Sequence, residues 1–546
     1  MVTRTAALAA ALAAAAPLPA LAQGALPTPV ETQQLRELDA WSVSALTREQ
    51  GALAPDLWNR TDPTFLATVF DRLPANYDSP AMQTLARRVL FSGGDAPRGD
   101  ALAASRKRFE ALGRMGAADE LATMAAGAGV ALSDPSIAQY AAQAELARGR
   151  RNEACARGRG AQFGETPPAF ILRLRAYCAA VGGDRAAADL ALELARAANA
   201  DDAWYTGAVA AAGGAPGARP PAARWDNSLA VQLSLAGQLR PGPSPLNNSS
   251  TLALVALARS DATPQPFRTQ AAALAFRRGV ISAQETRTIF AATPAEVTSG
   301  LPPIVLAARR VAAATPATGT ADTAEASLAR ATAIADALRQ STAWPDFYAA
   351  ARLFRADIAT FQSAPDAASA ALFARAALAV GDAQNGQRLV ASARQAGATE
   401  AQLAPLDAAL AVMANVRGDS GTVAMHRRID AAGSGAVNAR AAARDVAILS
   451  ALGAPVDGGV QAHLLANAPQ GGARAESGAM LALASSVERG AVGEGALLAV
   501  AAAGEGGPAR LDAESVERLI RALRGLRLED DARRVAVEAL LAGAPS

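Results

Sequence analysis

Apolar residues recur at spacings of three and four along most of the chain, which is the period of one buried face of an α-helix. The clearest example covers residues 169–199, where two apolar stripes flank a tight turn at residues 181–184. Gly183 frees the backbone of this turn for a left-handed helix end, and Asp184 is suited to cap the helix that follows. The pattern therefore predicts two helices joined by a short turn.

The same turn recurs farther along the chain, where residues 372–374 lead to Gly381 and Asp382 and then to a second apolar stripe at 389–393. The turn glycines form two series whose members stand 33 to 37 residues apart: Gly116, Gly149 and Gly183, then Gly381, Gly418 and Gly453. Periods near 34 residues are typical of a solenoid of helical hairpins.

Clusters of glycine and proline divide the pattern into regions. They are densest at residues 213–245, which predicts a junction between an N-terminal helical-repeat block at 32–212 and a C-terminal helical-repeat block at 246–546. Within the second block, residues 515–541 carry two amphipathic stretches joined at 525–528. These stretches are expected to form terminal cap helices.

Composition strengthens the helical interpretation. Hydrophobic residues make up 51% of the 546-residue chain but aromatic residues only 4%, so alanine and leucine dominate the apolar positions. Both are strong helix formers, and the expected fold class is all-α. Lys107 is the only lysine among many arginines, which together with the alanine excess indicates a GC-rich bacterial genome.

Small residues stand where the helices of a repeat are expected to cross, at positions counted from the turn glycine. On these positions the chain resembles the tetratricopeptide-like superfamily, with Leu172, Ala179 and Ala200 replacing the large residue, the tyrosine and the proline that this superfamily favours. The resemblance implies degenerate repeats over about half the chain and an α-solenoid of stacked antiparallel helical hairpins in two blocks. The small residues are Ala176, Ala188 and Ala195 in one unit and Ala374, Gly386 and Ala393 in another.

The first 22 residues have the pattern of a secretory signal peptide. Arg4 precedes an apolar run at residues 5–16, and small residues before Gln23 suit a cleavage between Ala22 and Gln23. Residues 23–31 then form an extended leader. Export to the periplasm is expected, with no membrane span after cleavage; an uncleaved N-terminal anchor is the alternative.

The charge balance argues against a nucleic-acid partner. The chain has 52 Lys and Arg against 50 Asp and Glu, which is too neutral for binding through phosphates. A local excess of positive charge is expected either to be a solvated helix face or to form a shallow basic patch for an anionic glycan or an acidic partner. The residues of this candidate patch are Arg106, Lys107, Arg108, Arg148, Arg150 and Arg151.

Cys155 and Cys178 are the only cysteines and fall on either side of a loop between two predicted helices. In an oxidising compartment such a pair is most simply a disulfide. Two buried free thiols are the alternative.

No residues with the spacing of a catalytic, cofactor or metal site are present. His426 and His463 lack the further ligands that a zinc site needs. Glu476, followed by Ser477, matches the start of the lytic-transglycosylase acid motif, but the other signatures of that family do not follow. We therefore expect no catalytic, cofactor-binding or metal-binding residue, and no cofactor.

Together these features predict a non-catalytic protein-interaction scaffold of the bacterial cell envelope. Its concave solenoid face is expected to hold other envelope proteins or peptide segments. The alternative is a peptidoglycan-associated protein, either a glycan-binding module or a lytic-transglycosylase-like superhelical protein.

Overall fold

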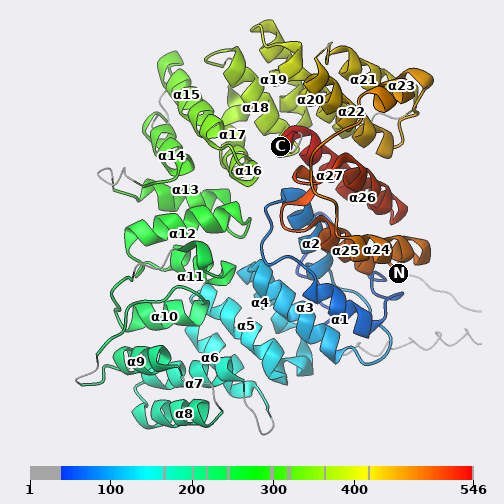
Figure 1. Cartoon of the computed structure of the whole chain (residues 1–546). Coiled ribbons are helices and arrows are strands. Elements are labelled where there is room, and N and C mark those ends of the chain that lie inside the picture. The colour runs from blue at the N-terminus through cyan, green and yellow to red at the C-terminus, as the bar shows by residue number, and fades with distance from the viewer. Residues whose placement is uncertain are drawn as a thin grey trace, which may run out of the picture. The chain divides into compact units, whose positions relative to one another are not determined.

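The computed structural model describes residues 39–163, 168–198, 202–216, 219–242, 246–294, 300–316, 321–361, 364–415, 418–433 and 435–543. Within these ranges the chain is all-α, with 27 α-helices, three short 3-10 helices and no β-strand (Figure 1). Isolated backbone bridges join Ala223 to Pro241 and Ala473 to Leu511. The all-α fold class expected from the sequence is confirmed.

The helices follow one another with short connections. The first are α1 (Pro63–Asp71), α2 (Pro80–Phe91), α3 (Leu102–Met115), α4 (Ala118–Ala126), η1 (Gly129–Ser133), α5 (Pro135–Ala147), α6 (Arg151–Gly160), α7 (Ala169–Val181), α8 (Arg185–Ala197) and α9 (Ala203–Ala212). The next are α10 (Ser228–Ala236), η2 (Leu246–Asn248), α11 (Thr251–Arg259), α12 (Gln265–Arg277), α13 (Ala283–Ala291), α14 (Pro303–Ala313), α15 (Ala324–Gln340), α16 (Trp344–Leu353), α17 (Arg355–Thr360) and α18 (Ala367–Ala379). The last are α19 (Ala383–Gln395), α20 (Glu400–Met413), α21 (Asp419–Asp430), α22 (Ala436–Ala451), α23 (Gly458–Ala466), α24 (Ser477–Arg489), α25 (Val492–Ala503), η3 (Gly507–Ala509), α26 (Ala513–Gly525) and α27 (Glu529–Ala542).

The turns between paired helices have the expected chemistry. Gly183 and Gly381 adopt positive φ angles of 81° and 79°. Asp184 and Asp382 each accept a hydrogen bond from the backbone N–H three residues farther on, at 3.0 and 3.2 Å, and so cap α8 and α19. The two turns predicted from the sequence are therefore confirmed. The other glycines of the two spacing series also have positive φ: Gly116 (75°), Gly149 (73°), Gly418 (59°) and Gly453 (96°).

The helices pack in a succession that closes on itself. Neighbouring groups contact one another in the order α3 with α5, α5 with α11, α11 with α12, α12 with α16, α16 with α18, and α18 with α20. Helix α20 then contacts α27, and α25 contacts α1 and α2 (Figure 1). The first and last described helices are thereby packed together.

Helix α2 lies among the first, middle and last helices. The backbone N–H of Ala81 donates to the carboxylate of Glu538 on α27 at 2.7 Å, and the side-chain amide of Gln83 donates to the carbonyl of Arg278 after α12. Helix α27 is itself packed against α2, α18, α20, α22 and α26. The two helices expected within 515–541 are present as α26 and α27, and α27 is enclosed by other helices rather than covering an open end.

Arginine side chains reach the carbonyl ends of many helices. A helix C-terminus carries partial negative charge and unpaired carbonyls, so a guanidinium satisfies both. Examples from different parts of the chain include Arg114 to Phe70 (2.8 Å), Arg268 to Ala258 (3.0 Å), Arg375 to Leu541 (2.9 Å), Arg444 to Ala539 (2.7 Å) and Arg524 to Ala451 (2.8 Å). These contacts tie each helix end to a neighbouring helix.

The Gly/Pro-rich segment at 213–245 contains α10, which packs against α5, α9 and α11. Asn227 caps α10, and the Ser228 hydroxyl donates to the carbonyl of Gln143 on α5 at 3.1 Å. Residues 38–546 form one compact unit. The division into two repeat blocks near residue 213 stays a prediction of the sequence.

Candidate functional site

The predicted signal peptide, its cleavage between Ala22 and Gln23, and the leader at 23–31 lie outside the described residues. In the part of the chain that the structure describes, no helix combines the length and apolarity needed to cross a bilayer.

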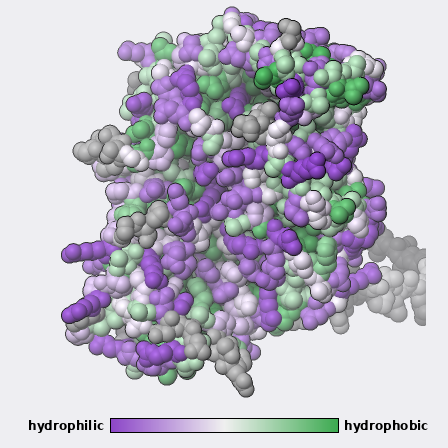
Figure 2. All heavy atoms as spheres, viewed as in Figure 1, coloured by the Kyte–Doolittle hydropathy of each residue, from purple (hydrophilic) through white to green (hydrophobic). Residues whose placement is uncertain are grey.

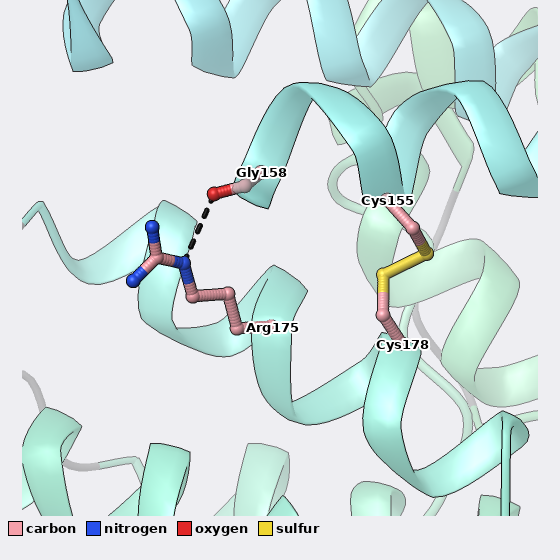
Figure 3. The surroundings of a disulfide bond; sticks show 4 residues. All are labelled: Cys155, Gly158, Arg175 and Cys178. Carbon is pink, nitrogen blue, oxygen red and sulfur yellow. Dashed lines mark hydrogen bonds between the residues drawn. A yellow bond between two sulfur atoms is a disulfide. The ribbon is translucent and has the colours of Figure 1, made fainter. Parts of the chain in front are cut away.

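Cys155 on α6 and Cys178 on α7 are joined by a disulfide, with their Cα atoms 5.8 Å apart (Figure 3). Arg175, also on α7, donates through Nε to the carbonyl of Gly158 at 2.9 Å, close to the disulfide (Figure 3). The covalent bond and the hydrogen bond together join the end of α6 to α7.

The six residues of the candidate basic patch occupy different environments. Arg106 pairs with Asp134 at 2.6 Å, and Lys107 pairs with Asp71 at 2.8 Å. Arg148 forms ion pairs with both Asp119 and Glu145 at 2.9 Å. Arg150 and Arg151 are exposed around the start of α6. Carboxylates thus accompany three of the six positive charges.

Arg108, the remaining member, is fully buried. Its guanidinium donates to the carbonyls of Leu90, Ser92 and Ala40 at 2.7 to 3.1 Å. The same group stands 5.0 Å from the ring of Trp41 and 5.7 Å from that of Trp58. Arg108 therefore joins segments of the core and is not part of a surface patch.

The histidines take part in local contacts. Nε2 of His426 lies 2.7 Å from an oxygen of Asp457, and Nε2 of His463 lies 3.2 Å from the carbonyl of Ala439. Among the described residues, no three His, Cys, Asp or Glu side chains gather as metal ligands would.

Glu476 caps the start of α24. Its carboxylate accepts hydrogen bonds from the backbone N–H groups of Gly478 and Ala479, at 3.0 and 2.5 Å. These bonds lower the pKa of Glu476 below its ordinary value, the Ala479 bond contributing most. A general acid needs the opposite shift, because it must hold a proton near neutral pH.

An open groove of about 1350 Å³ lies between α19, α20 and α21 and is here called the α19–α21 groove. Gln384 and Gln387 of α19 are exposed along one wall, and Val423 of α21 is about half exposed on the other. Small and flexible apolar side chains form much of the floor: Ala404, Ala408, Ala411, Met413 and Ala424. The groove offers apolar contact below and side-chain amides at its edge.

Charged groups of both signs line the α19–α21 groove. Arg394 pairs with Asp407 at 2.7 Å and reaches Glu400 at 3.4 Å. Partial burial raises the pKa of Asp407 above its ordinary value, although Arg394 acts in the opposite direction. Arg427 is exposed on α21.

A buried ion pair holds one wall of the groove in place. Nε of Arg428 on α21 donates to Asp445 on α22 at 2.7 Å, and both side chains are only 7% exposed. Burial raises the pKa of Asp445, and the adjacent Arg428 opposes that effect. The pair fixes α21, which forms one wall of the groove, against α22.

The groove-lining residues were not singled out in the sequence. The sequence did contain a signal. Gly386 marks the side of the helix where another helix crosses, and Gln384 and Gln387 lie on other sides of the same helix.

On the face shown in Figure 2, hydrophilic side chains cover much of the surface and hydrophobic ones lie in scattered patches. Comparison with protein-family models, with curated proteins and with solved structures finds no match to this chain.

Proposed function

We propose that the chain is an exported, periplasmic α-solenoid that serves as a non-catalytic protein-interaction scaffold of the bacterial cell envelope. The α19–α21 groove holds an extended peptide segment of another envelope protein. The groove itself is the observation on which this proposal depends: it is large, and both small apolar side chains and polar ones line it.

The packing of small residues supports the tetratricopeptide-like arrangement. Ala176, Ala188 and Ala195 of one unit are buried, as are Ala374 and Ala393 of the other. A Cβ atom at Gly386 would stand 2.3 Å from a side-chain atom of Leu378, so a larger residue there would force the Leu378 side chain to move. Paired helices such as α7 with α8 and α18 with α19 are the hairpins of the proposed solenoid.

The chemistry of the groove favours an extended peptide. The side-chain amides of Gln384 and Gln387 both donate and accept hydrogen bonds, as backbone peptide groups require. The alanine-rich floor leaves room for apolar side chains of a ligand, and Arg427 and Asp430 provide charges for polar ones. Such a surface binds a segment through its backbone and through alternate side chains.

The alternative functions have less support. In a glycan-binding module, basic side chains would be free to meet an anionic polymer, whereas Arg106, Lys107 and Arg148 are paired with carboxylates. In a lytic-transglycosylase-like protein, Glu476 would serve as the acid, whereas its pKa is lowered by backbone hydrogen bonds.

Site-specific photo-crosslinking in intact cells tests the proposal. A photoreactive residue in place of Gln387 should cross-link to one contiguous segment of an envelope protein, identified by mass spectrometry of the joined peptides. The same residue in place of Leu481, which is 76% exposed on α24 and outside the groove, serves as the position control.

A matched pair of substitutions separates groove binding from general adhesion. Val423→Arg should reduce the Gln387 cross-link about tenfold, because a long charged side chain would occupy the apolar path of the ligand. Val437→Arg, at an exposed valine of α22 outside the groove, should leave the yield unchanged. Equal cross-linking from positions 387 and 481 would contradict the proposal. An adduct with glycan alone would contradict it as well.

A further inference from the structure

A second cavity, of about 380 Å³, lies where the first, middle and last helices meet. Its walls come from the first turn of α2, from Trp344 and Tyr348 of α16, from the turn between α18 and α19, and from α27. It adjoins the α19–α21 groove, since Ala383 and Met413 line both. The binding proposed below for this cavity does not depend on the function proposed for the α19–α21 groove.

Glu538 of α27 is a buried carboxyl group in the wall of this cavity, only 4% exposed. One of its oxygens, Oε2, accepts the backbone N–H of Ala81 at 2.7 Å. The other, Oε1, makes no hydrogen bond of normal geometry, and neither does Nε1 of Trp344 in the same wall. The Trp344 indole and the Ser79 hydroxyl nonetheless lie close enough to favour the ionised carboxylate.

No basic side chain pairs with Glu538 among the contacts of the described residues. Arg375 stands 5.6 Å from the Trp344 ring, but it donates to the carbonyl of Leu541. A buried carboxylate without a cation is costly when ionised. Glu538 therefore has no counter-ion in direct contact with its carboxylate among the described residues.

The opposite charge lies one helical turn away. Arg534 of α27 lines the cavity with a half-exposed side chain, and it shares Asp531 with another arginine. Arg533 and Asp530 also line the cavity and pair with each other. Positions 534 and 538 are separated by about 6 Å along the helix axis, at 1.5 Å per residue.

We propose that this cavity binds a small zwitterion, an amino acid or short peptide, whose ammonium group pairs with Glu538 and whose carboxylate pairs with Arg534. The ammonium group supplies the cation that the buried carboxylate lacks. The ring of Tyr348, in the same wall, also favours a cation near its face. Leu378, Val380 and Val537 provide apolar contact for the body of the ligand.

The titration of Glu538 gives the site a recognisable pH dependence. Burial raises its pKa to about 7, and Tyr348, whose pKa burial also raises, stays neutral across this range. The other charged groups that line the cavity are Arg533, Arg534 and Asp530. Because the ammonium group pairs with the ionised carboxylate, affinity should rise as pH increases from about 6 to about 7.5, below the range in which the α-amino group of a peptide loses its proton.

Isothermal titration calorimetry of the full mature chain tests the assignment. The probes are leucine and the dipeptide alanyl-alanine, which distinguish a free amino acid from a short peptide. N-acetyl-alanyl-alanine lacks the ammonium group, and alanyl-alanine amide lacks the carboxylate. At least one of the unblocked probes should bind, and blocking either end should weaken it about tenfold or more.

Substitutions assign the two ends. Glu538→Gln should weaken the unblocked ligand and abolish the pH dependence, while leaving the affinity for the N-acetylated ligand unchanged. Arg534→Gln should act only on ligands with a free carboxylate. Arg521→Gln, at an exposed arginine of α26 outside the cavity, is the matched control and should bind as the unaltered chain does.

Each contrary result would overturn the assignment. These are no binding by either unblocked probe, equal binding of the N-acetylated dipeptide, or a Glu538→Gln variant that keeps both affinity and pH dependence. Circular dichroism of each variant shows whether it is folded. Failure of the groove cross-link would leave this assignment standing, because the two experiments use different walls.

Discussion

Arg88 on α2 forms an ion pair with Asp531 on α27, although the two residues are 443 positions apart in the sequence. The Asp531 side chain is 2% exposed and also accepts a hydrogen bond from Arg534 at 2.9 Å. The pair links the first described helices to the last. The closure of the helical succession therefore has a specific electrostatic contact at its centre.

Asp531→Asn should destabilise the chain by about 3 kcal/mol, because it leaves the guanidinium of Arg88 largely buried without its counter-ion. Urea unfolding gives the magnitude. Hydrogen exchange should quicken in both α2 and α27, and a change confined to one of them would contradict the link. Asp530→Asn, at the exposed neighbour, should change stability by no more than about 0.5 kcal/mol.

Glu538 should make the chain less stable as pH rises. Its pKa is about 7 in the folded chain against an ordinary value of 4.5, so the folded state binds more protons than the unfolded state between these values. The stabilisation is complete below pH 4.5 and is lost progressively as pH rises to about 7. The loss amounts to about 3 kcal/mol at most. Thermal unfolding across this range should show a flatter profile for Glu538→Gln than for the unaltered chain.

Arg108→Lys should destabilise the chain by about 2 to 4 kcal/mol, because one ammonium group cannot reach three carbonyls and lie against two indole rings. Tryptophan fluorescence reports the change directly, since Trp41 and Trp58 surround this side chain. The matched control is Arg106→Lys, two positions earlier, where the side chain is 46% exposed. If Arg108→Lys and Arg106→Lys lower the free energy of unfolding equally, the burial of Arg108 is not the cause of the destabilisation.

The Cys155 to Cys178 disulfide should be intact in protein isolated from the periplasm. It closes a loop with a sequence separation of 23, so the double substitution Cys155→Ser, Cys178→Ser should cost about 3 kcal/mol. Faster hydrogen exchange is expected in α6 and α7, with little change in α19 and α20. Mass spectrometry of alkylated, non-reduced protein checks the bond, and two freely alkylated thiols would contradict it.

Export should leave Gln23 as the first residue of the periplasmic protein. We expect the small residues before the cleavage point and the apolar run at 5–16 to direct this processing. Intact-mass measurement of the fractionated protein decides between cleavage and the uncleaved anchor. Arg substitution at Ala22 should block cleavage and retain the longer form in the membrane fraction.

Local features were readily predicted from the sequence. The turns at Gly183 and Gly381 combine a residue free to adopt positive φ with an aspartate cap, and both signals act within a few residues. The helices expected within 515–541 were present for the same reason, since their apolar period extends over their whole length.

Long-range features could not be predicted in this way. Arg106, Lys107 and Arg108 are adjacent charged residues on one helix, and nothing in their order distinguishes the buried member from its neighbours. The contact between Arg88 and Asp531 similarly depends on the packing angles of all the helices between them, which no local pattern specifies. Only one local sequence feature indicated the cavity at Glu538, namely an acidic residue within the otherwise apolar run at 535–541.

The arginines at the helix ends change what an approaching molecule experiences. The formal net charge of the chain, which counts every arginine as one full positive charge, is +2. Arg375, Arg444 and Arg524 direct their guanidinium groups inward, where the partial negative charge of a helix C-terminus offsets part of each. Carboxylates such as Asp261 and Asp530 stay in solvent. In ion exchange, which responds to charges at the surface, the folded protein should therefore bind a cation exchanger less tightly than its formal charge implies.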